Sequence, residues 1–145
     1  MAICIKFVIS LQKYHQNRHT EQENKIINSM LKIYGIPACN TMKKTFEYLQ
    51  NKSISFEFFN YKKNNLSPEV LQEFIDQLTI EKVLNKQGST YRQLPEEIKL
   101  ALNDPQKAFE FLLEKNSAIK RPIIVSNKGI IAGFNETDLD KWLNI

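Results

Sequence analysis

The feature that most constrains the fold is a switch in hydrophobic period on either side of a short turn. Residues 31–34 alternate as a β-strand does, and Gly35-Ile36-Pro37 must turn the chain. Residues 54–61 return to period two and are rich in β-branched and aromatic side chains. Between them lies an apolar stripe with helical spacing, made of Met42, Phe46 and Leu49. This order predicts a strand, a helix and a strand, with the two strands parallel neighbours.

The middle of the chain has the signals of several helices. Ser67-Pro68-Glu69 is typical of a helix start, with the serine as N-cap, the proline at the first helical position and the glutamate near the positive end of the dipole. Residues 85–90 are polar and contain a glycine, which predicts a loop. Pro95 and Asp104-Pro105 mark two further helix starts. We therefore expect a helical segment between the second and third strands.

The C-terminal part returns to strands. Residues 122–125 are β-branched, Asn127-Lys128-Gly129 predicts a turn, and residues 130–134 predict the partner strand of a hairpin. Residues 135–138 combine a capping asparagine with an acidic residue three positions later, which predicts a final helix. The whole pattern is βαβ, then helices, then ββα.

Composition excludes several classes of protein. The chain has 145 residues, 42% of them apolar and 25% charged, which is enough for one core. A net charge of +4 without a basic cluster does not favour direct nucleic-acid binding. No apolar run approaches the roughly 20 residues that span a bilayer. Two cysteines do not make a disulfide framework. We expect a cytoplasmic, monomeric protein that does not bind membranes.

The first 29 residues differ from the rest. Their apolar stretch lacks both the preceding positive segment and the cleavage site of a signal peptide, and the following residues are too acidic for a mitochondrial presequence. We interpret residues 1–29 as an N-terminal extension, disordered or the product of an upstream mis-start, and residues 30–145 as the domain. His15 and His19 lie four residues apart but lack further ligands other than Cys4, so no metal site is expected.

Cys39 is the strongest candidate for a reactive residue, because it lies in the loop between the first strand and the first helix. The first turn of a helix offers unpaired N–H groups and the positive end of the helix dipole. Both favour a thiolate over a thiol, and Lys43 and Lys44 add positive charge in the next turn. The same N–H groups are suited to an oxyanion or a carboxylate. A lone cysteine is more often a buried filler, however, so position alone leaves its role open.

Four segments resemble the arsenate reductase (ArsC)/Spx/YffB-like family, and its YffB-like branch in particular. They are residues 34–44 (YGIPACNTMKK), residues 84–94 (LNKQGSTYRQL), residues 119–125 (IKRPIIV) and Gly133-Phe134. The matches span residues 30–145 in order and at the spacing of the family. The resemblance implies an α/β thioredoxin-like fold: a four-stranded mixed sheet with flanking helices and an inserted helical subdomain. It also implies that Cys39 is the active-site thiol, that Arg121 reaches toward it, and that Pro122 is the cis-proline of the fold.

The sequence also departs from two branches of that family. Spx-type redox switches carry a second cysteine three residues after the first, where this chain has Met42. Arsenate reductases carry an arginine where this chain has Asn85, and another near Gly133-Phe134. Arg92 lies seven residues after Asn85 and is a candidate substitute. Arsenate reductases are expected to place three arginines around the arsenic oxyanion. This chain lacks the two named above, which disfavours arsenate reduction.

The function expected from the resemblance is that of a glutathione-dependent thiol oxidoreductase. Cys39 would attack a disulfide or another oxidised substrate and form a mixed disulfide, which external glutathione or a glutaredoxin-like reductant would resolve. Lys43 and Arg121 would hold an anionic group beside the sulfur. Asn40 and Thr41 would offer hydrogen bonds to the thiolate or to the substrate. Glutathione is thus expected as a cosubstrate, without a tightly bound cofactor.

Two other functions stay open. The first is a glutaredoxin-coupled arsenate reductase, which uses the same cysteine but needs a tighter oxyanion site. The second is not enzymatic: a regulator like Spx that binds RNA polymerase or another partner through its surface.

Overall fold

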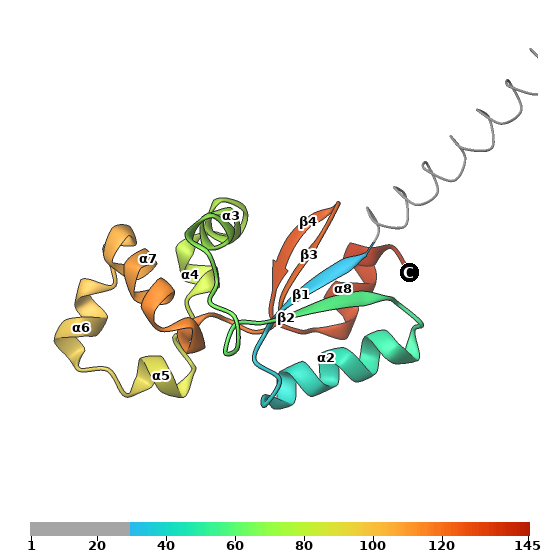
Figure 1. The fold of residues 1–145 in the computed structure, drawn as a ribbon, viewed down its shortest axis with the longest axis horizontal. Coiled ribbons are helices and arrows are strands. Elements are labelled where there is room, and N and C mark those ends of the chain that lie inside the picture. The colour runs from blue at the N-terminus through green and yellow to red at the C-terminus, as the bar shows by residue number, and fades with distance from the viewer. Residues whose placement is uncertain (1–29) are drawn as a thin grey trace, which may run out of the picture. The chain divides into compact units, whose positions relative to one another are not determined.

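The structure is a computed structural model that describes residues 30–145; the expectations for the N-terminal extension, Cys4, His15 and His19 lie outside these residues. Within the described part, no helix is long and apolar enough to cross a membrane. The predicted order, βαβ, helices, then ββα, is confirmed (Figure 1). The elements are β1 (Leu31–Gly35), α2 (Asn40–Asn51), β2 (Phe56–Asn60), α3 (Pro68–Leu78), α4 (Ile80–Val83), α5 (Ser89–Arg92), α6 (Glu96–Ala101), α7 (Pro105–Glu114), the 3-10 turn η1 (Asn116–Ala118), β3 (Ile123–Ser126), β4 (Gly129–Ala132) and α8 (Glu136–Leu143).

The four strands form one mixed sheet in the order β2-β1-β3-β4. Strands β1 and β2 are parallel, with Leu31 opposite Phe56, as the βαβ pattern predicted. Strand β3 runs antiparallel to β1, and β4 runs antiparallel to β3 as the second half of a hairpin. This is the thioredoxin-like arrangement that the resemblance implied.

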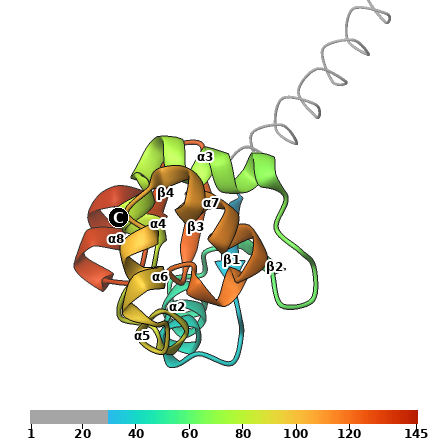
Figure 2. The ribbon, with the colours of Figure 1, turned by 90° about the vertical axis from the view of Figure 1, so that its left-hand side faces the viewer.

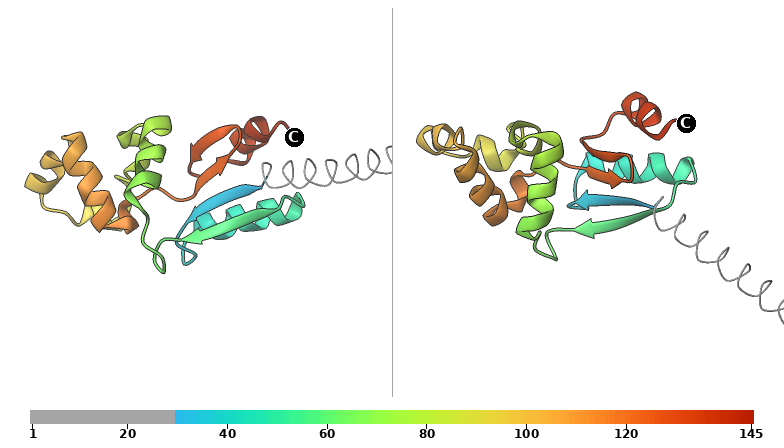
Figure 3. Two further views of the ribbon diagram at one scale, coloured as in Figure 1. Left: turned by 45° about the horizontal axis from the view of Figure 1, so that its top comes forward. Right: turned by 90° about the horizontal axis from the view of Figure 1, so that it is seen from above.

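Each face of the sheet carries its own apolar layer, because side chains alternate along the strands. Ile33 and Ile124 are fully buried toward α2 and α8, where Leu49 and Leu139 complete the layer. On the other face the sheet packs against α3 and the helices that follow, through side chains that include Tyr34, Phe74, Ile123 and Ile130. Figure 2 shows α3 above the strands and α2 below them, and Figure 3 gives two further views of this arrangement.

The helical insertion is more finely divided than the sequence predicted. Helices α6 and α7 follow Pro95 and Asp104, as expected, and the Asp104 carboxylate accepts the Lys107 N–H at 3.0 Å. The loop predicted at residues 85–90 is shorter, because Ser89–Arg92 forms α5. Helix α4 was not predicted; at four residues, neither α4 nor α5 is long enough for a period of 3.6 to be visible. Figure 2 views the insertion end-on, with α5, α6 and α7 labelled.

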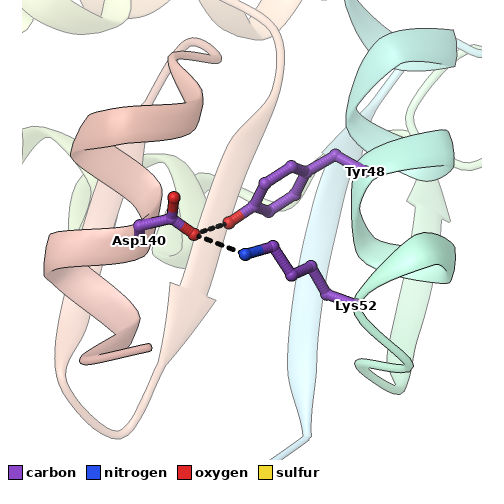
Figure 4. Close-up of polar contacts among 3 residues, drawn as sticks. All are labelled: Tyr48, Lys52 and Asp140. Atoms are coloured by element: carbon purple, nitrogen blue, oxygen red, sulfur yellow. Dashed lines mark hydrogen bonds and ion pairs between the residues drawn. The ribbon is translucent and has the colours of Figure 1, made fainter.

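A polar cluster joins the two helices of the α2/α8 layer (Figure 4). The Tyr48 hydroxyl on α2 donates a hydrogen bond to the Asp140 carboxylate on α8. The Lys52 ammonium lies 3.3 Å from the same carboxylate oxygen. Burial raises the pKa of Tyr48 to about 12, with the Asp140 contact acting in the same direction. The hydrogen bond from Tyr48, together with Lys52, lowers the pKa of Asp140.

These two shifts predict how Tyr48→Phe changes stability with pH. The lowered Asp140 pKa stabilises the fold above the unfolded value of about 3.9, and this gain is lost as the pH falls through the folded value. The raised Tyr48 pKa stabilises it below the unfolded value of about 10, and this gain is lost toward pH 12. Urea denaturation should therefore show the variant less stable than the wild type at pH 7, with the difference shrinking at both extremes. Tyr91→Phe is the matched control, and an equal pH-independent loss in both variants would contradict the prediction.

Candidate active site

The register of the sheet places Cys39 and Arg121, the two predicted catalytic residues, at the same end of the sheet. Tyr34, near the end of β1, lies opposite Ile123, the first residue of β3. The chain therefore leaves β1 toward Cys39 at the same end at which it enters β3 from Arg121. The sequence alone could name both residues, but only the β1–β3 pairing brings their loops together.

Cys39 is the N-cap of α2. Its backbone is extended (φ −137°, ψ 133°), its N–H donates to the Pro37 carbonyl at 2.9 Å, and its carbonyl accepts the Lys43 N–H at 3.1 Å. The side chain is half-buried. Within the described part of the chain no side chain caps this helix, which leaves the first-turn N–H groups available to the sulfur.

The surroundings of Cys39 favour the thiolate. Burial opposes ionisation, but the backbone N–H groups of Met42 and Thr41, the Thr41 hydroxyl and the charge of Arg121 outweigh it and lower the pKa of Cys39. The sequence interpretation assigned the positive charge to Lys43 and Lys44. In the structure both lysines are exposed, and the charge that acts on the thiol is that of Arg121.

The loop that carries Arg121 is anchored on both sides. The Arg121–Pro122 peptide bond is cis, the isomer that the resemblance implied. The Gly133 N–H donates to the Pro122 carbonyl at 2.7 Å, and the Lys120 N–H donates to the Val83 carbonyl at 2.8 Å. Arg121 is half-buried and Pro122 is buried. The guanidinium is thus presented from a fixed backbone.

The remaining predicted residues divide into two groups. Asn40 and Thr41 open α2 directly after Cys39, and the Thr41 carbonyl accepts the buried Thr45 hydroxyl at 2.8 Å, which ties down the first turn. Lys43 follows in the same turn with an exposed side chain. Arg92 is exposed at the end of α5 in the helical insertion and is not among the groups that act on the Cys39 pKa. Within residues 30–145, no three His, Cys, Asp or Glu side chains are grouped to hold a metal ion.

One neighbour of the site was not predicted from the sequence. The Tyr61 side chain is 1% exposed, and its hydroxyl has no hydrogen-bond partner among the described residues. Burial raises its pKa, and the charges of Arg121 and Cys39 both act on it. Its N–H donates to the Gly35 carbonyl at 3.2 Å, just before the Cys39 loop. A tyrosine at the end of a strand is typical of a core residue, so the sequence did not indicate that Tyr61 lies near the site.

We expect Tyr61→Phe to leave the protein as stable as the wild type or more stable. A buried hydroxyl without a partner costs about 1–3 kcal/mol, so its removal should raise the free energy of unfolding by up to that amount. Urea denaturation at pH 7 measures the change. Tyr48→Phe is the contrasting control, because its hydroxyl is bonded. A loss of stability in Tyr61→Phe would mean that this hydroxyl has a partner in solution.

Comparison with known proteins gives one consistent picture. The sequence matches the model of the ArsC family over residues 34–142. A solved structure named YFFB protein is 34% identical, covers 79% of this chain and 99% of its own, and has a TM-score of 0.72. An arsenate reductase (ArsC) related protein from Brucella melitensis is 33% identical, covers 80% and 96%, and has a TM-score of 0.66. The global transcriptional regulator Spx of Lactiplantibacillus plantarum is 28% identical and covers 79% and 86%.

Proposed function

The chain belongs to the ArsC family, and on that premise we propose that it is a thiol oxidoreductase that works with glutathione through Cys39. The observation that carries the proposal is the set of groups around the sulfur. A helix N-terminus without a side-chain cap, the Thr41 hydroxyl and Arg121 all favour the thiolate. The thiolate is the form of cysteine that attacks disulfides.

The proposed reaction proceeds in two exchanges. The Cys39 thiolate attacks the glutathionyl sulfur of a mixed disulfide between a substrate thiol and glutathione; a Cys39–glutathione disulfide forms, and the substrate leaves as a thiolate that takes up a proton. A second glutathione, as thiolate, then attacks the glutathionyl sulfur on Cys39. Glutathione disulfide forms and the Cys39 thiolate is regenerated, so two electrons pass from glutathione to the substrate.

Residues near the sulfur have separate tasks in this proposal. Arg121 stabilises the thiolate and attracts a carboxylate of glutathione, and Lys43 adds a second cation on the exposed side of α2. Asn40 and Thr41 offer hydrogen bonds to the sulfur or to the bound peptide. Met42 stands where Spx-type switches carry their second cysteine, and it is fully buried. The proposal therefore assigns the reduction of the Cys39–glutathione disulfide to an external thiol.

The pKa of Cys39 tests the first half of the proposal. We expect the rate of alkylation by neutral iodoacetamide, followed by mass spectrometry of Cys39, to rise with pH at a midpoint below the roughly 8.5 of a free cysteine. Incubation with glutathione disulfide should give one glutathione adduct on Cys39. A midpoint at or above the free value, without an adduct, would contradict the proposal.

Arg121→Gln should raise the pKa of Cys39 and slow its alkylation near neutral pH. The half-buried guanidinium is the charged group that lowers this pKa, and glutamine keeps a similar length without the charge. Lys107→Gln on α7 is the matched control for loss of one positive charge. Equal alkylation profiles in the two variants would show that Arg121 does not act on the thiol.

Two further candidate functions rest on named relatives. The Brucella relative is described as related to arsenate reductase, so arsenate-dependent oxidation of glutathione with a glutaredoxin present is the discriminating assay. The Spx relative is described as a transcriptional regulator, so binding to purified RNA polymerase that persists in Cys39→Ala would favour that class. The thiol oxidoreductase is favoured over the first by the absence of arginine at Asn85. The absence of a second cysteine at Met42 argues against an Spx-type redox switch but not against binding of a partner.

A further inference from the structure

A cavity of about 660 Å³ opens beside β4 and does not include Cys39. Both Ile130 and Ile131 line it. Successive residues of a strand point to opposite faces of the sheet, and these two belong to the two opposite apolar layers. A cavity that reaches both must lie along the edge of the strand. Strand β4 is indeed the outer strand of the sheet, with β3 on one side only.

The backbone of β4 has hydrogen-bonding groups directed to that edge. In an antiparallel pair, residues alternate between those bonded to the partner strand and those whose N–H and C=O point away. The Gly133 N–H donates to the Pro122 carbonyl. By the register of β3 and β4, Ile131 and Gly129 are then also bonded inward. Ile130 and Ala132 therefore direct their N–H and C=O groups outward, beside the cavity.

Two lysines and one carboxylate give the lining of the same cavity a net positive charge. Lys82, on α4, and Lys120 both line it, and the Lys120 N–H bond to the Val83 carbonyl holds their backbones side by side. Within residues 30–145, neither lysine has a carboxylate within 4.0 Å, and Asp138 is the single acidic residue of the lining. Leu78 and Phe134 add apolar surface to its lining.

We propose that this edge binds an extended segment of a protein partner that carries acidic side chains, as a strand added beside β4. Outward N–H and C=O groups supply the main-chain bonds of such a strand, and a row of alternate side chains gives the specificity. Lys82 and Lys120 select acidic residues in that row by charge. A small free anion would use the lysines but leave the strand edge and the apolar part of the lining without a partner. The surface is separate from the thiol chemistry proposed for Cys39.

The test uses the full chain and three synthetic probes. The first is a fluorescently labelled seven-residue peptide in which valine and glutamate alternate. The second replaces its glutamates by lysines. The third keeps the glutamates but carries N-methyl groups on alternate residues, so that it lacks the donors of an added strand. Binding is followed by fluorescence anisotropy, and its location by amide shifts in ¹⁵N NMR spectra.

We expect the glutamate peptide alone to bind, with the largest amide shifts at Ile130 and Ala132. The double variant Lys82→Glu/Lys120→Glu should weaken it by at least about 10-fold, or about 1.4 kcal/mol, whereas Lys107→Glu and Cys39→Ser should not. No binding, equal binding of the N-methylated peptide, or shifts confined to other parts of the chain would overturn the proposal. Equal displacement by free glutamate would show an anion site only and would overturn it too.

Discussion

Cys39→Ser should abolish glutathione-dependent reduction of a mixed-disulfide substrate, with a loss of about 1,000-fold or more to the uncatalysed rate. The hydroxyl of serine is not ionised near neutral pH, so the helix N-terminus and Arg121 have no thiolate to stabilise. The fold should be unaffected, because the half-buried side chain changes by one atom. The measurement is turnover of a glutathionylated peptide, coupled to reduction of the glutathione disulfide formed.

The chain supplies its own control for this experiment. Cys4 is its other cysteine, and Cys4→Ser should retain full turnover. If Cys39→Ser keeps activity while Cys4→Ser loses it, the reactive thiol is misassigned. If both single variants keep full activity, the turnover does not depend on either thiol and the proposed mechanism is wrong.

Local sequence patterns were enough to predict most of the helices and strands. Ser67, Asp104 and Asn135 were read as helix starts, and each accepts a backbone N–H from the first turn of its helix. Such caps are visible in sequence because the residue type and the geometry are tied together within four positions. The strands of the sheet and the β3–β4 hairpin were visible for the same reason, since period two and a turn are local patterns.

Contacts between residues far apart in the chain could not be predicted from the sequence. Tyr48 and Asp140 are separated by 92 positions, and no local pattern links them. The same holds for Tyr61, because the lack of a hydrogen-bond partner for its hydroxyl among residues 30–145 is evident only once these residues are packed. Lys82 and Lys120 also come to lie near each other only through the hydrogen bond from the Lys120 N–H to the Val83 carbonyl, which joins distant segments. Each of these depends on packing between elements, which the spacing of residue types does not encode.

The residues of the candidate site were predictable, and its electrostatics were predictable only in part. Cys39 and the Arg121–Pro122 pair could be named because they stand beside the strands on which the resemblance rests. Nearness in sequence assigned the positive charge beside the thiol to Lys43 and Lys44, whereas the family resemblance implied that Arg121 reaches toward Cys39. Side chains in the first turn of a helix can point into solvent, whereas the β1–β3 register brings Arg121 to Cys39 from 82 positions away.

Met42→Ala should destabilise the protein by about 2–5 kcal/mol, a large part of the stability of a domain of this size. Met42 is fully buried and belongs to the layer between the sheet and α2. Its sulfur fits against Gly35, where an added Cβ would lie 2.6 Å from it. Truncation leaves a cavity under the first turn of α2 that the strand cannot close. Thermal and urea denaturation at pH 7 measure the loss.

The same substitution should also slow the alkylation of Cys39 near neutral pH, because the Met42 N–H is one of the donors that favour the thiolate. Met42→Leu is the matched control: it nearly conserves volume and should cost less than about 1.5 kcal/mol with unchanged alkylation. If alanine lowers stability without changing alkylation, the first turn of α2 is held by Cys39 and Thr41 alone. If it changes both together, the core beneath the helix fixes the donors around the sulfur, and packing at Met42 is then part of what makes Cys39 reactive.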